Sequence, residues 1–364
     1  MIGSLDAGGI QAFSVNISKG LMDLGYTVDF AVDHNEYDFY ADIIESLGCN
    51  LFFFKAPSYL NVHAYMAQWD EFFRQHPEID IVHGHARSTA ALYLSSARRA
   101  GMHTVAHSHS TSNGVGIRGM AKNVTRRQIW RYAEAYLACS EEAGAWLYGK
   151  HWMKDAPSYV IQNGIDLDRF AFDGISRCNI RHQLDIDESA HVYGHVGRFN
   201  RVKNHEFLLK VFELIKACDP SAVLLLVGDG ELRGKIESLV KESALEASVR
   251  FVGNVTDAAP YYSVMDLLIF PSLWEGVPLS LVEAQAAGLP IVASDRINEA
   301  SFVIKDACRI LSLGSPGEWA RCAIDLSCMQ NERGGSTLDD LVNSPYSLAN
   351  TCRAMDCVYR SLLD

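Results

Sequence analysis

Short apolar runs alternate along this chain with stretches in which apolar residues recur every three or four positions. Runs of about four to eight apolar residues between turn residues are typical of buried strands, and the wider spacing is typical of helices with one buried face. A parallel pair of strands needs a crossover, which is usually a helix. The regular alternation of the two patterns therefore predicts parallel α/β domains.

In the first half, the pattern predicts a helix that begins at Gly8-Gly9 and ends at Gly25. One face of this helix carries Ile10, Phe13, Ile17, Leu21 and Leu24. Strands are expected at residues 27–32, 51–54, 79–82, 104–106, 135–138 and 159–161, with helices between them.

The second half repeats this alternation. Strands are expected at residues 191–196, 222–227, 249–252, 267–270 and 291–293. Helices are expected at residues 204–217, 231–245 and 259–264, around Glu283, and at 347–363, where the last helix is amphipathic. Residues 163–186, rich in Asp and turn residues, are interpreted as the connection between the halves. We expect two doubly wound domains, 1–168 and 169–345, and a C-terminal helix, 346–364, that packs back on the first domain. Two such domains facing each other would form a cleft, and open parallel sheets bind ligands beyond the carboxyl ends of their strands.

The start of the chain is short for a domain of this kind, because only MIGSLDA precedes Gly8-Gly9. Either the first strand is very short or the start given lies downstream of the true one. In the second case the first sheet would lack part of a central strand.

Composition narrows the class of protein. A chain of 364 residues is longer than the chains that usually fold around one hydrophobic core, so two domains are expected. The net charge of −12 argues against a broad nucleic-acid surface, which needs Lys and Arg to neutralise phosphates. The nine cysteines are scattered without a CxxC pair, so no metal site is indicated and reduced thiols are expected. No apolar run reaches the about 18 to 20 residues that span a bilayer, and a cytoplasmic location is expected.

Two glutamates draw attention within PSLWEGVPLSLVEAQAAGLPIVASD, residues 271–295. Glu275 lies in a turn and Glu283 in the following helix, so both can face a pocket at the N-terminus of that helix. Such a terminus attracts anions, and carboxylates beside it suit ligand hydroxyls better than phosphates. The alternative for Glu283 is a capping box with Ser280, in which its carboxylate would reach a backbone N–H instead of a ligand. Glu275 could equally be an exposed turn residue.

A second cluster follows the strand at 191–196 and consists of Gly197-Arg198 and Lys203-Asn204. Two cations at the end of a strand and the start of a helix are suited to binding a diphosphate. A solvated loop with ordinary surface cations would show the same sequence pattern.

Three further patterns carry weaker signals. Gly8-Gly9 before a helix lets a ligand approach the backbone, or is simply a turn. Val227 to Gly230 is interpreted as a strand-to-helix turn, because Asp229 would repel a pyrophosphate. His107 and His109 follow a strand and could bind a substrate hydroxyl or be structural.

As a set and in this order, the motifs resemble those of the retaining glycosyltransferases of family 4. The set comprises the segments above, Phe251 to Gly253, Asp266 to Ser272 and Asn163 to Asp166. Residues 106–114, 139–149 and 294–302 are similar to bacterial members that build exopolysaccharide or capsule. The resemblance implies a GT-B fold and transfer of a sugar from a nucleotide-sugar, expected to be a UDP-sugar, to a saccharide or lipid-linked saccharide.

The resemblance also implies roles for individual residues. Arg198 and Lys203 would bind the donor diphosphate, Glu275 the hydroxyls of the donor sugar and Glu283 those of the ribose. The backbone N–H groups of Leu279 and Ser280 would face the phosphates, and Gly253 would lie near the base. His109, with His107 beside it, would lie near the transferred sugar, and Gly8-Gly9 would close the phosphate side. No cofactor or metal is expected, since Arg198, Lys203 and helix termini supply the positive charge.

Two matters stay open. Residues 117–131 cluster five basic residues with Ile129 and Trp130 and could rest on anionic lipid, or form a solvated cationic helix. The alternatives to a transferase are a GT-B epimerase of sugar nucleotides and a non-catalytic protein that binds them.

Overall fold

The structure is a computed structural model that describes residues 1–5, 9–33, 39–56, 61–85, 89–109, 128–154, 157–327, 333 and 338–364. The chain forms two compact units. Unit 1 comprises Met1–Gly164 together with Leu348–Asp364, and unit 2 comprises Ile165–Ser347. The division follows Gly164, a little before the boundary at residue 168 that the sequence suggests.

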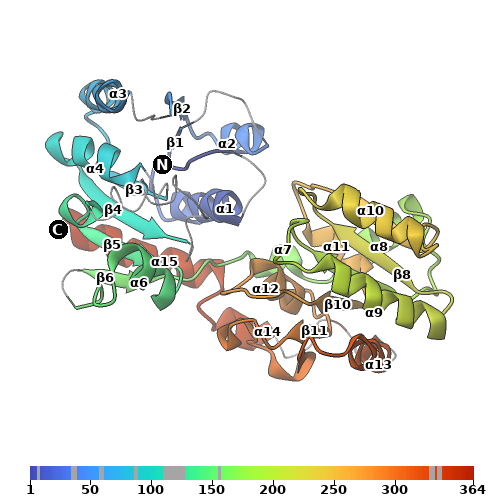
Figure 1. The fold of residues 1–364 in the computed structure, drawn as a ribbon. Coiled ribbons are helices and arrows are strands. Elements are labelled where there is room, and N and C mark those ends of the chain that lie inside the picture. The colour runs from blue at the N-terminus through green and yellow to red at the C-terminus, as the bar shows by residue number, and fades with distance from the viewer. Residues whose placement is uncertain are drawn as a thin grey trace. The chain divides into compact units, whose positions relative to one another are not determined.

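The described strands of unit 1 pair in parallel. β1 (Phe30–Val32) pairs with β2 (Leu51–Phe53), and a second sheet has the order β3 (Ile81–Gly84), β4 (His103–Ser108), β5 (Ala135–Ala138), β6 (Ser158–Val160). The described helices are α1 (Gly9–Asp23), α2 (Ala41–Ser46), α3 (Val62–Gln75), α4 (Ala90–Arg99), the 3-10 turn η1 (Ile129–Arg131), α6 (Glu141–Tyr148) and α15 (Leu348–Leu363). Figure 1 shows their arrangement.

Helices cover both faces of the β3–β6 sheet because its strands are apolar on both sides. On β4, Val105 packs with Phe13 of α1 and Met355 of α15, whereas the next residue, Ala106, packs with Trp69 of α3 on the other face. Successive strand residues point to opposite faces, which accounts for this division. The C-terminal helix is therefore part of the core of unit 1 (Figure 1).

The first two residues join the two sheets of unit 1. The N–H of Ile2 donates to the carbonyl of Ala31 at 3.0 Å, the amine of Met1 donates to the carbonyl of His83 at 2.7 Å, and the N–H of His85 donates to the carbonyl of Met1 at 2.9 Å. Met1 and Ile2 thus lie between β1 and β3. A cavity of about 540 Å³ beside them is lined from β1, β3, α1, α3 and α15.

Unit 2 is a six-stranded parallel sheet with helices on both faces. The strand order is β12 (Cys308–Leu311), β11 (Ile291–Ser294), β10 (Leu267–Phe270), β7 (Val192–Val196), β8 (Val223–Val227), β9 (Val249–Gly253). The described helices are α7 (Leu167–Phe170), α8 (Gly174–Gln183), α9 (His205–Cys218), α10 (Arg233–Glu242), α11 (Ala259–Val264), α12 (Leu279–Ala286), η2 (Glu299–Ser301), η3 (Lys305–Ala307), α13 (Pro316–Ser327) and α14 (Leu338–Val342).

The order reverses between β7 and β10, because β8 and β9 extend the sheet on one side and β11 and β12 on the other. Doubly wound sheets bind ligands at such a switch point, beyond the carboxyl ends of the two strands.

The division between the units falls at the start of the segment 163–186 that the sequence analysis interprets as the connection, but most of this segment forms helices α7 and α8 of unit 2. Asp166 accepts a hydrogen bond from the N–H of Arg169, and Asp173 accepts one from the N–H of Ile175. Both aspartates are therefore helix caps, a role for which Asp is as well suited as for turns. The buried Arg181 of α8 then ties the helix to the core through Asp266 at 2.7 Å.

Candidate functional site

The loops after β7 and β10 are tied to each other at the switch point of unit 2. Asn204, just before α9, has a left-handed backbone with φ 56°, and its side-chain amide donates to the carbonyl of Pro271 at 3.1 Å. The N–H of Leu273 donates to the carbonyl of Val202 at 2.8 Å. These bonds bring the Lys203 and Glu275 segments together.

Lys203 and Glu275 form an ion pair, with Nζ 2.8 Å from Oε1. Their side chains are only 13% and 19% exposed, so the pair lies largely inside the site instead of on an open surface. The ammonium also lies 4.3 Å from the ring centre of Phe270, and the Ser272 hydroxyl donates to Glu275 at 3.3 Å. Glu275 is therefore no exposed turn residue, and the two residues predicted from separate motifs share one site.

Glu283 lies on α12 and does not form a capping box. The helix begins at Leu279 with Pro278 as its N-cap, which places Ser280 inside the first turn, and no side chain caps the helix. The Glu283 carboxylate instead accepts a hydrogen bond from the Tyr262 hydroxyl at 2.6 Å. The alternative that Glu283 caps its own helix is thus wrong in this structure.

The groups around Glu283 shift the pKa of its carboxyl group in opposite directions. Burial raises the pKa of the carboxyl group, while the Tyr262 hydrogen bond and the charges of Arg169 and Lys203 lower it, with the net shift upward. The charge of Lys203 thus acts on the pKa of Glu283, and the same ammonium pairs with Glu275. The Lys203 ammonium is therefore close enough to influence both glutamates.

Arg198 differs from Lys203. Its side chain is 72% exposed, and its guanidinium lies 3.6 Å from Glu231, which is 60% exposed. The sequence grouped the two cations, yet the structure holds Lys203 inside the site and leaves Arg198 in contact with solvent.

Glycines bring the neighbouring loops close to the switch point. Val227 to Gly230 is the turn between β8 and α10, as its sequence suggested. A Cβ atom on Gly228, at φ 129°, would lie 2.3 Å from the Gly197 carbonyl oxygen. Gly253, at φ 87°, accepts a hydrogen bond from the N–H of Gly228 and lies beside Arg233. Both glycines fit positions that a larger residue would strain.

Sequence analysis did not identify several polar side chains that lie in or near this site. Tyr262 stands in an apolar helix, and nothing in the sequence connects it with Glu283. His195 and His205 lie buried near Lys203, and burial lowers the pKa of His205 to about 4 and that of His195 well below its ordinary value. The Nδ1 atom of His195 lies 2.9 Å from the carbonyl of Ile269, while its Nε2 has no hydrogen-bond partner among the described residues.

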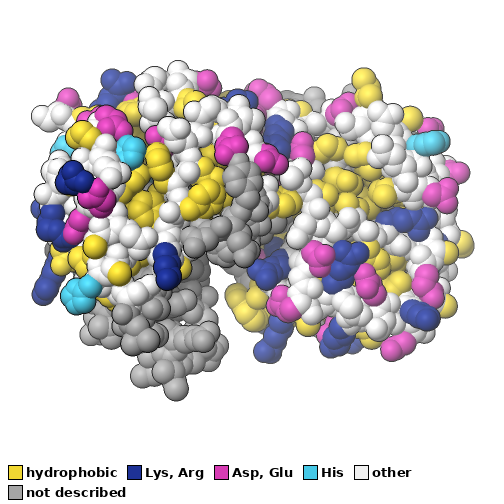
Figure 2. Space-filling model, turned by 90° about the horizontal axis from the view of Figure 1, so that it is seen from above, with side chains coloured by type: hydrophobic (Ala, Val, Ile, Leu, Met, Phe, Trp, Pro, Cys, Tyr) yellow, Lys and Arg dark blue, Asp and Glu magenta, His cyan; other side chains and the backbone are white. Residues whose placement is uncertain are grey.

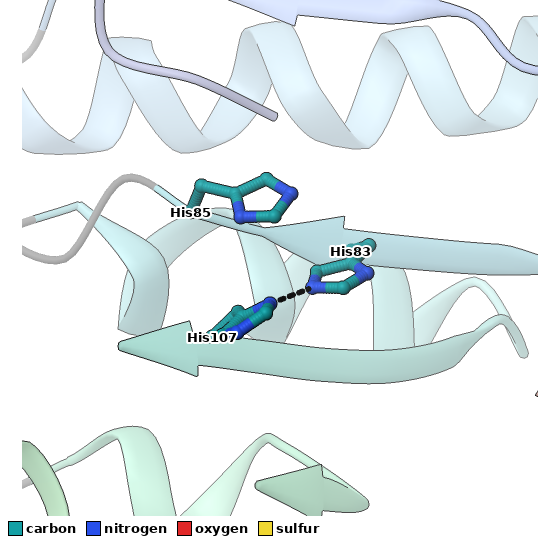
Figure 3. Close-up of side chains that lie close together, drawn as sticks. All are labelled: His83, His85 and His107. Atoms are coloured by element: carbon teal, nitrogen blue, oxygen red, sulfur yellow. Dashed lines mark hydrogen bonds between the residues drawn. The ribbon is translucent and has the colours of Figure 1, made fainter. Parts of the chain in front are cut away.

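In unit 1, His107 and His109 lie beside two further histidines that the sequence analysis did not identify. His83 and His85, at the end of β3, face His107 and His109 of β4, and Figure 3 shows three of the four rings. A signal existed, because VHGH at 82–85 and AHSH at 106–109 repeat one pattern after two predicted strands.

The nitrogens of His83, His85 and His107 lie within 4.8 Å of one another, close enough to meet one metal ion (Figure 3). Burial lowers the pKa of all three rings well below the ordinary histidine value, so they are neutral, the form that binds metals. Two of these rings are also at hydrogen-bond distance, with His83 Nε2 3.2 Å from His107 Nδ1. The absence of a metal stays a prediction.

Two predicted features fall partly outside the described residues. Gly8 lies there, and Gly9 is the first residue of α1. Residues 117–127 of the predicted lipid-binding segment lie there too. Ile129 is buried, and the indole N–H of Trp130 donates to the carbonyl of Tyr148. Ile129 and Trp130 therefore pack into unit 1, and contact of the 117–131 segment with anionic lipid stays a prediction.

The distribution of surface charge and the hydrophobicity of the helices are relevant to contact with a membrane or another charged partner. On the face seen in Figure 2, Lys and Arg side chains are interspersed with Asp and Glu side chains. Among the described residues, no helix combines the length and the hydrophobicity that crossing a membrane requires.

Comparison with known proteins identifies the family of this chain. Residues 7–169 match the family described as "Glycosyltransferase Family 4", and residues 190–328 match "Glycosyl transferases group 1". The chain is 32% identical over 325 residues to the putative glycosyltransferase EpsF of Bacillus subtilis, covering 88% of this chain and 85% of the relative. The chain is a family 4 glycosyltransferase.

Two further proteins are similar to this chain. An Escherichia coli UDP-Gal:alpha-D-GlcNAc-diphosphoundecaprenol alpha-1,3-galactosyltransferase is 28% identical over 243 residues, which cover 62% of this chain and 60% of the relative. The crystal structure of Anabaena Alr3699/HepE in complex with UDP and glucose superposes with a TM-score of 0.80 at 17% identity, covering 99% of this chain and 98% of the other. That likeness shows the GT-B fold, with two Rossmann-like domains, as the resemblance implied. The glycosyltransferase is of the type found in bacterial polysaccharide synthesis.

Proposed function

We propose that this glycosyltransferase moves a sugar from a UDP-sugar to a saccharide or lipid-linked saccharide on the cytoplasmic side of a bacterial membrane, with retention of anomeric configuration. The observation that carries the proposal is the Lys203–Glu275 pair at the switch point of unit 2. A cation and a carboxylate held together beside the start of α12 are suited to a ligand that is anionic at one end and rich in hydroxyls at the other.

In the ligand-free site each charge satisfies the other. A bound diphosphate would draw the Lys203 ammonium to itself, and the Glu275 carboxylate would then accept hydrogen bonds from the hydroxyls of the donor sugar. The exposed Arg198 would close on the diphosphate from solvent, because its single contact with Glu231 is long and weak. The N–H groups of Leu279 and Ser280, in the first turn of α12, would add donors.

Glu283 suits the ribose of the donor. Its carboxylate is held by Tyr262 and lies within the influence of Lys203. A partly buried carboxylate with one oxygen bonded to Tyr262 has further acceptor capacity for a ribose hydroxyl. Gly253, at the end of β9, would leave room for the base.

Support for a UDP-sugar comes from relatives. The Escherichia coli relative is named for transfer from UDP-Gal to a diphosphoundecaprenol-linked sugar, and Alr3699/HepE was crystallised with UDP and glucose and with UDP-glucose. These names favour a uridine donor and a lipid-linked acceptor for this chain.

For the chemical step we propose departure of the donor diphosphate through an oxocarbenium-like transition state, with attack of the acceptor hydroxyl on the same face. The bond between the anomeric carbon and the diphosphate oxygen breaks, the bond to the acceptor oxygen forms, and the leaving phosphate takes the acceptor proton. Lys203 and Arg198 would stabilise the charge that grows on the phosphate. Removing a donor that is held in place, as Lys203 is, costs about 100 to 1,000-fold in rate, and removing the exposed Arg198 costs less.

The test incubates purified protein with a panel of UDP- and GDP-sugars, with and without saccharide and undecaprenyl-linked acceptors. Expected results are release of UDP and a product whose anomeric configuration, read by NMR coupling constants, matches that of the donor. Interconversion of the donor would instead identify an epimerase, and binding without turnover would identify a non-catalytic protein. Product with inverted configuration would contradict the retaining mechanism.

Contact with anionic membrane also stays a proposal. It rests on the basic residues of the 117–131 segment, since Ile129 and Trp130 pack inward. Flotation with liposomes should recover more protein with anionic than with neutral lipid, and equal recovery would remove the proposal.

A further inference from the structure

Two imidazole pairs cross from β3 to β4 in unit 1. His83 Nε2 lies 3.2 Å from His107 Nδ1, and His85 Nδ1 lies 2.7 Å from His109 Nε2. Each pair ends on a further side chain. His83 Nδ1 lies 2.6 Å from the Tyr359 hydroxyl of α15, and His109 Nδ1 lies 3.0 Å from Asn163 Oδ1.

The Asn163 contact defines which nitrogen of His109 carries the proton. An amide oxygen only accepts hydrogen bonds, so His109 Nδ1 must be the donor. In a neutral ring the other nitrogen is then bare, and His109 Nε2 is an acceptor. The facing nitrogen, His85 Nδ1, must therefore carry a proton and donate to it. The hydrogen bonds run in one direction, from His85 to His109 to Asn163.

Burial keeps His85 and the two rings beside it neutral. The pKa of His85 is lowered well below its ordinary value by burial first and then by the neighbouring histidines. Burial is also the largest cause of the lowered pKa of His83 and His107. Phe13 adds an apolar wall, with its ring centre 5.1 Å from that of His109 and 6.1 Å from that of His85. A second proton on the His85–His109 pair would have to be held in these apolar surroundings, at a high cost in free energy.

We propose that His85 and Asn163 are positioning residues, which hold His109 as a neutral Nδ1-protonated ring whose Nε2 accepts a hydrogen bond from a sugar hydroxyl. In the ligand-free protein the N–H of His85 occupies that acceptor, and the hydroxyl takes its place when substrate binds. This inference rests on the proposed function, because a sugar hydroxyl reaches His109 only if the protein binds a donor sugar where the resemblance to family 4 implies.

The decisive measurement reads the proton directly. In protein labelled with ¹⁵N-histidine, long-range ¹H–¹⁵N correlation spectra distinguish protonated from bare ring nitrogens, and the His109 signals are assigned by their loss in His109→Ala. The expected result is a proton on Nδ1 and a bare Nε2. A proton on Nε2 in the unmodified protein would overturn the inference whatever the activity.

Paired variants separate positioning from mere packing. Asn163→Leu removes the acceptor at similar size and should mix the two tautomers of His109 and lower kcat about tenfold, the equivalent of one net hydrogen bond, with little change in KM for the donor. Asn163→Asp keeps an acceptor oxygen and should retain the tautomer. His85→Phe keeps a ring without a donor and should lower kcat, whereas His85→Asn places an amide N–H near the position of Nδ1 and should restore part of it. Unchanged kcat in both Asn163→Leu and His85→Phe would overturn the positioning role.

Two controls complete the design. If the unmodified protein shows the expected tautomer but transfers no sugar from any donor tested, the proposed function fails while the hydrogen-bond arrangement stands. Zinc is added to the labelled protein and then removed by dialysis. Retention of one zinc per chain, abolished in His83→Ala, would overturn the inference, since the rings would then be metal ligands.

Discussion

In both units polar side chains gather at the carboxyl ends of neighbouring parallel strands, but the two groups carry different charge. After β7 and β10 of unit 2 stand an ammonium and a carboxylate at 2.8 Å. Around the ends of β3 and β4 of unit 1 stand four imidazoles, three of which have a pKa well below the ordinary value because they are buried. A charged pair can exchange its partner for an anionic ligand, whereas neutral rings can only exchange one hydrogen bond for another. The difference suggests that unit 2 binds charge and unit 1 orients hydroxyls.

The strongest test of this contrast removes the carboxylate of the charged site. Glu275→Ala should lower kcat about 100 to 1,000-fold, because a preorganised group that stabilises the reacting sugar is lost. Steady-state rates of UDP release measure the effect. The control is Glu71→Ala, which removes an exposed carboxylate of α3 in unit 1 that pairs only with neighbouring exposed groups and should change the rate less than twofold. Full activity in Glu275→Ala would falsify the assigned role.

The next test compares the two cations of the charged site. Lys203→Met should lower kcat/KM about 100-fold and also lower the free energy of unfolding, because it leaves Glu275 largely buried without its ion partner. Arg198→Met should lower kcat/KM by about tenfold and change stability by less than about 0.5 kcal/mol, because the Arg198 side chain is 72% exposed.

Kinetics combined with chemical denaturation measures both quantities. Equal losses of stability in the two variants would contradict the different placement of Lys203 and Arg198.

The neutral rings should make unit 1 the more acid-sensitive unit. The native pKa of a buried histidine lies below the value of about 6.5 in the unfolded chain, so the unfolded chain binds more protons and stability falls as the pH drops below 6.5. The loss approaches about 1.4 kcal/mol per pH unit for each such ring. The described residues include three histidines of this kind in unit 1 and two, His195 and His205, in unit 2. One carboxyl group in each unit, Asp33 and Glu283, has a raised pKa and acts in the opposite direction.

Hydrogen exchange at pH 6.5 and 5.5, corrected for intrinsic rates, tests this difference. Amides of β3 and β4 should lose up to about 100-fold more protection than those of β7 and β10. This is the effect over one pH unit of one additional histidine and of the Met1 amine, whose pKa is lowered to about 5 by burial. An equal or larger loss in unit 2 would contradict the count of neutral rings.

The sequence predicted the architecture because its strands are short apolar runs between turn residues, and each predicted strand has a counterpart in the structure. It did not indicate the helices within residues 163–186, because Asp166 and Asp173 are equally typical of turns and of helix caps. It also did not indicate β12, in which Arg309 interrupts the apolar run expected of a strand.

For the candidate site, the sequence could group Lys203 with Arg198 and Glu275 with Glu283, since each pair is close along the chain. It could not foresee that Lys203 pairs with Glu275, because that contact depends on β7 and β10 being neighbours in the sheet. Tyr262 and Asn163 were missed as partners for the same reason: their contacts join residues that only the fold brings together.

The smallest expected effect concerns Glu283, the one group of the charged site whose burial opposes its charge. Burial raises its pKa, so the native protein holds a proton there more readily than the unfolded chain, and ionisation at neutral pH costs stability. Glu283→Gln removes the charge and keeps an oxygen that can accept from Tyr262. The melting temperature should therefore rise by roughly 2 to 4 °C at pH 8, the shift that about 1 kcal/mol gives a domain of this size, while donor affinity falls. The rise should shrink as the pH drops through the raised pKa, because the unmodified carboxyl group is then protonated as well. A melting temperature that falls in Glu283→Gln, or a rise that does not depend on pH, would show that the ionised carboxylate is well accommodated and that the charged site contains no strained charge.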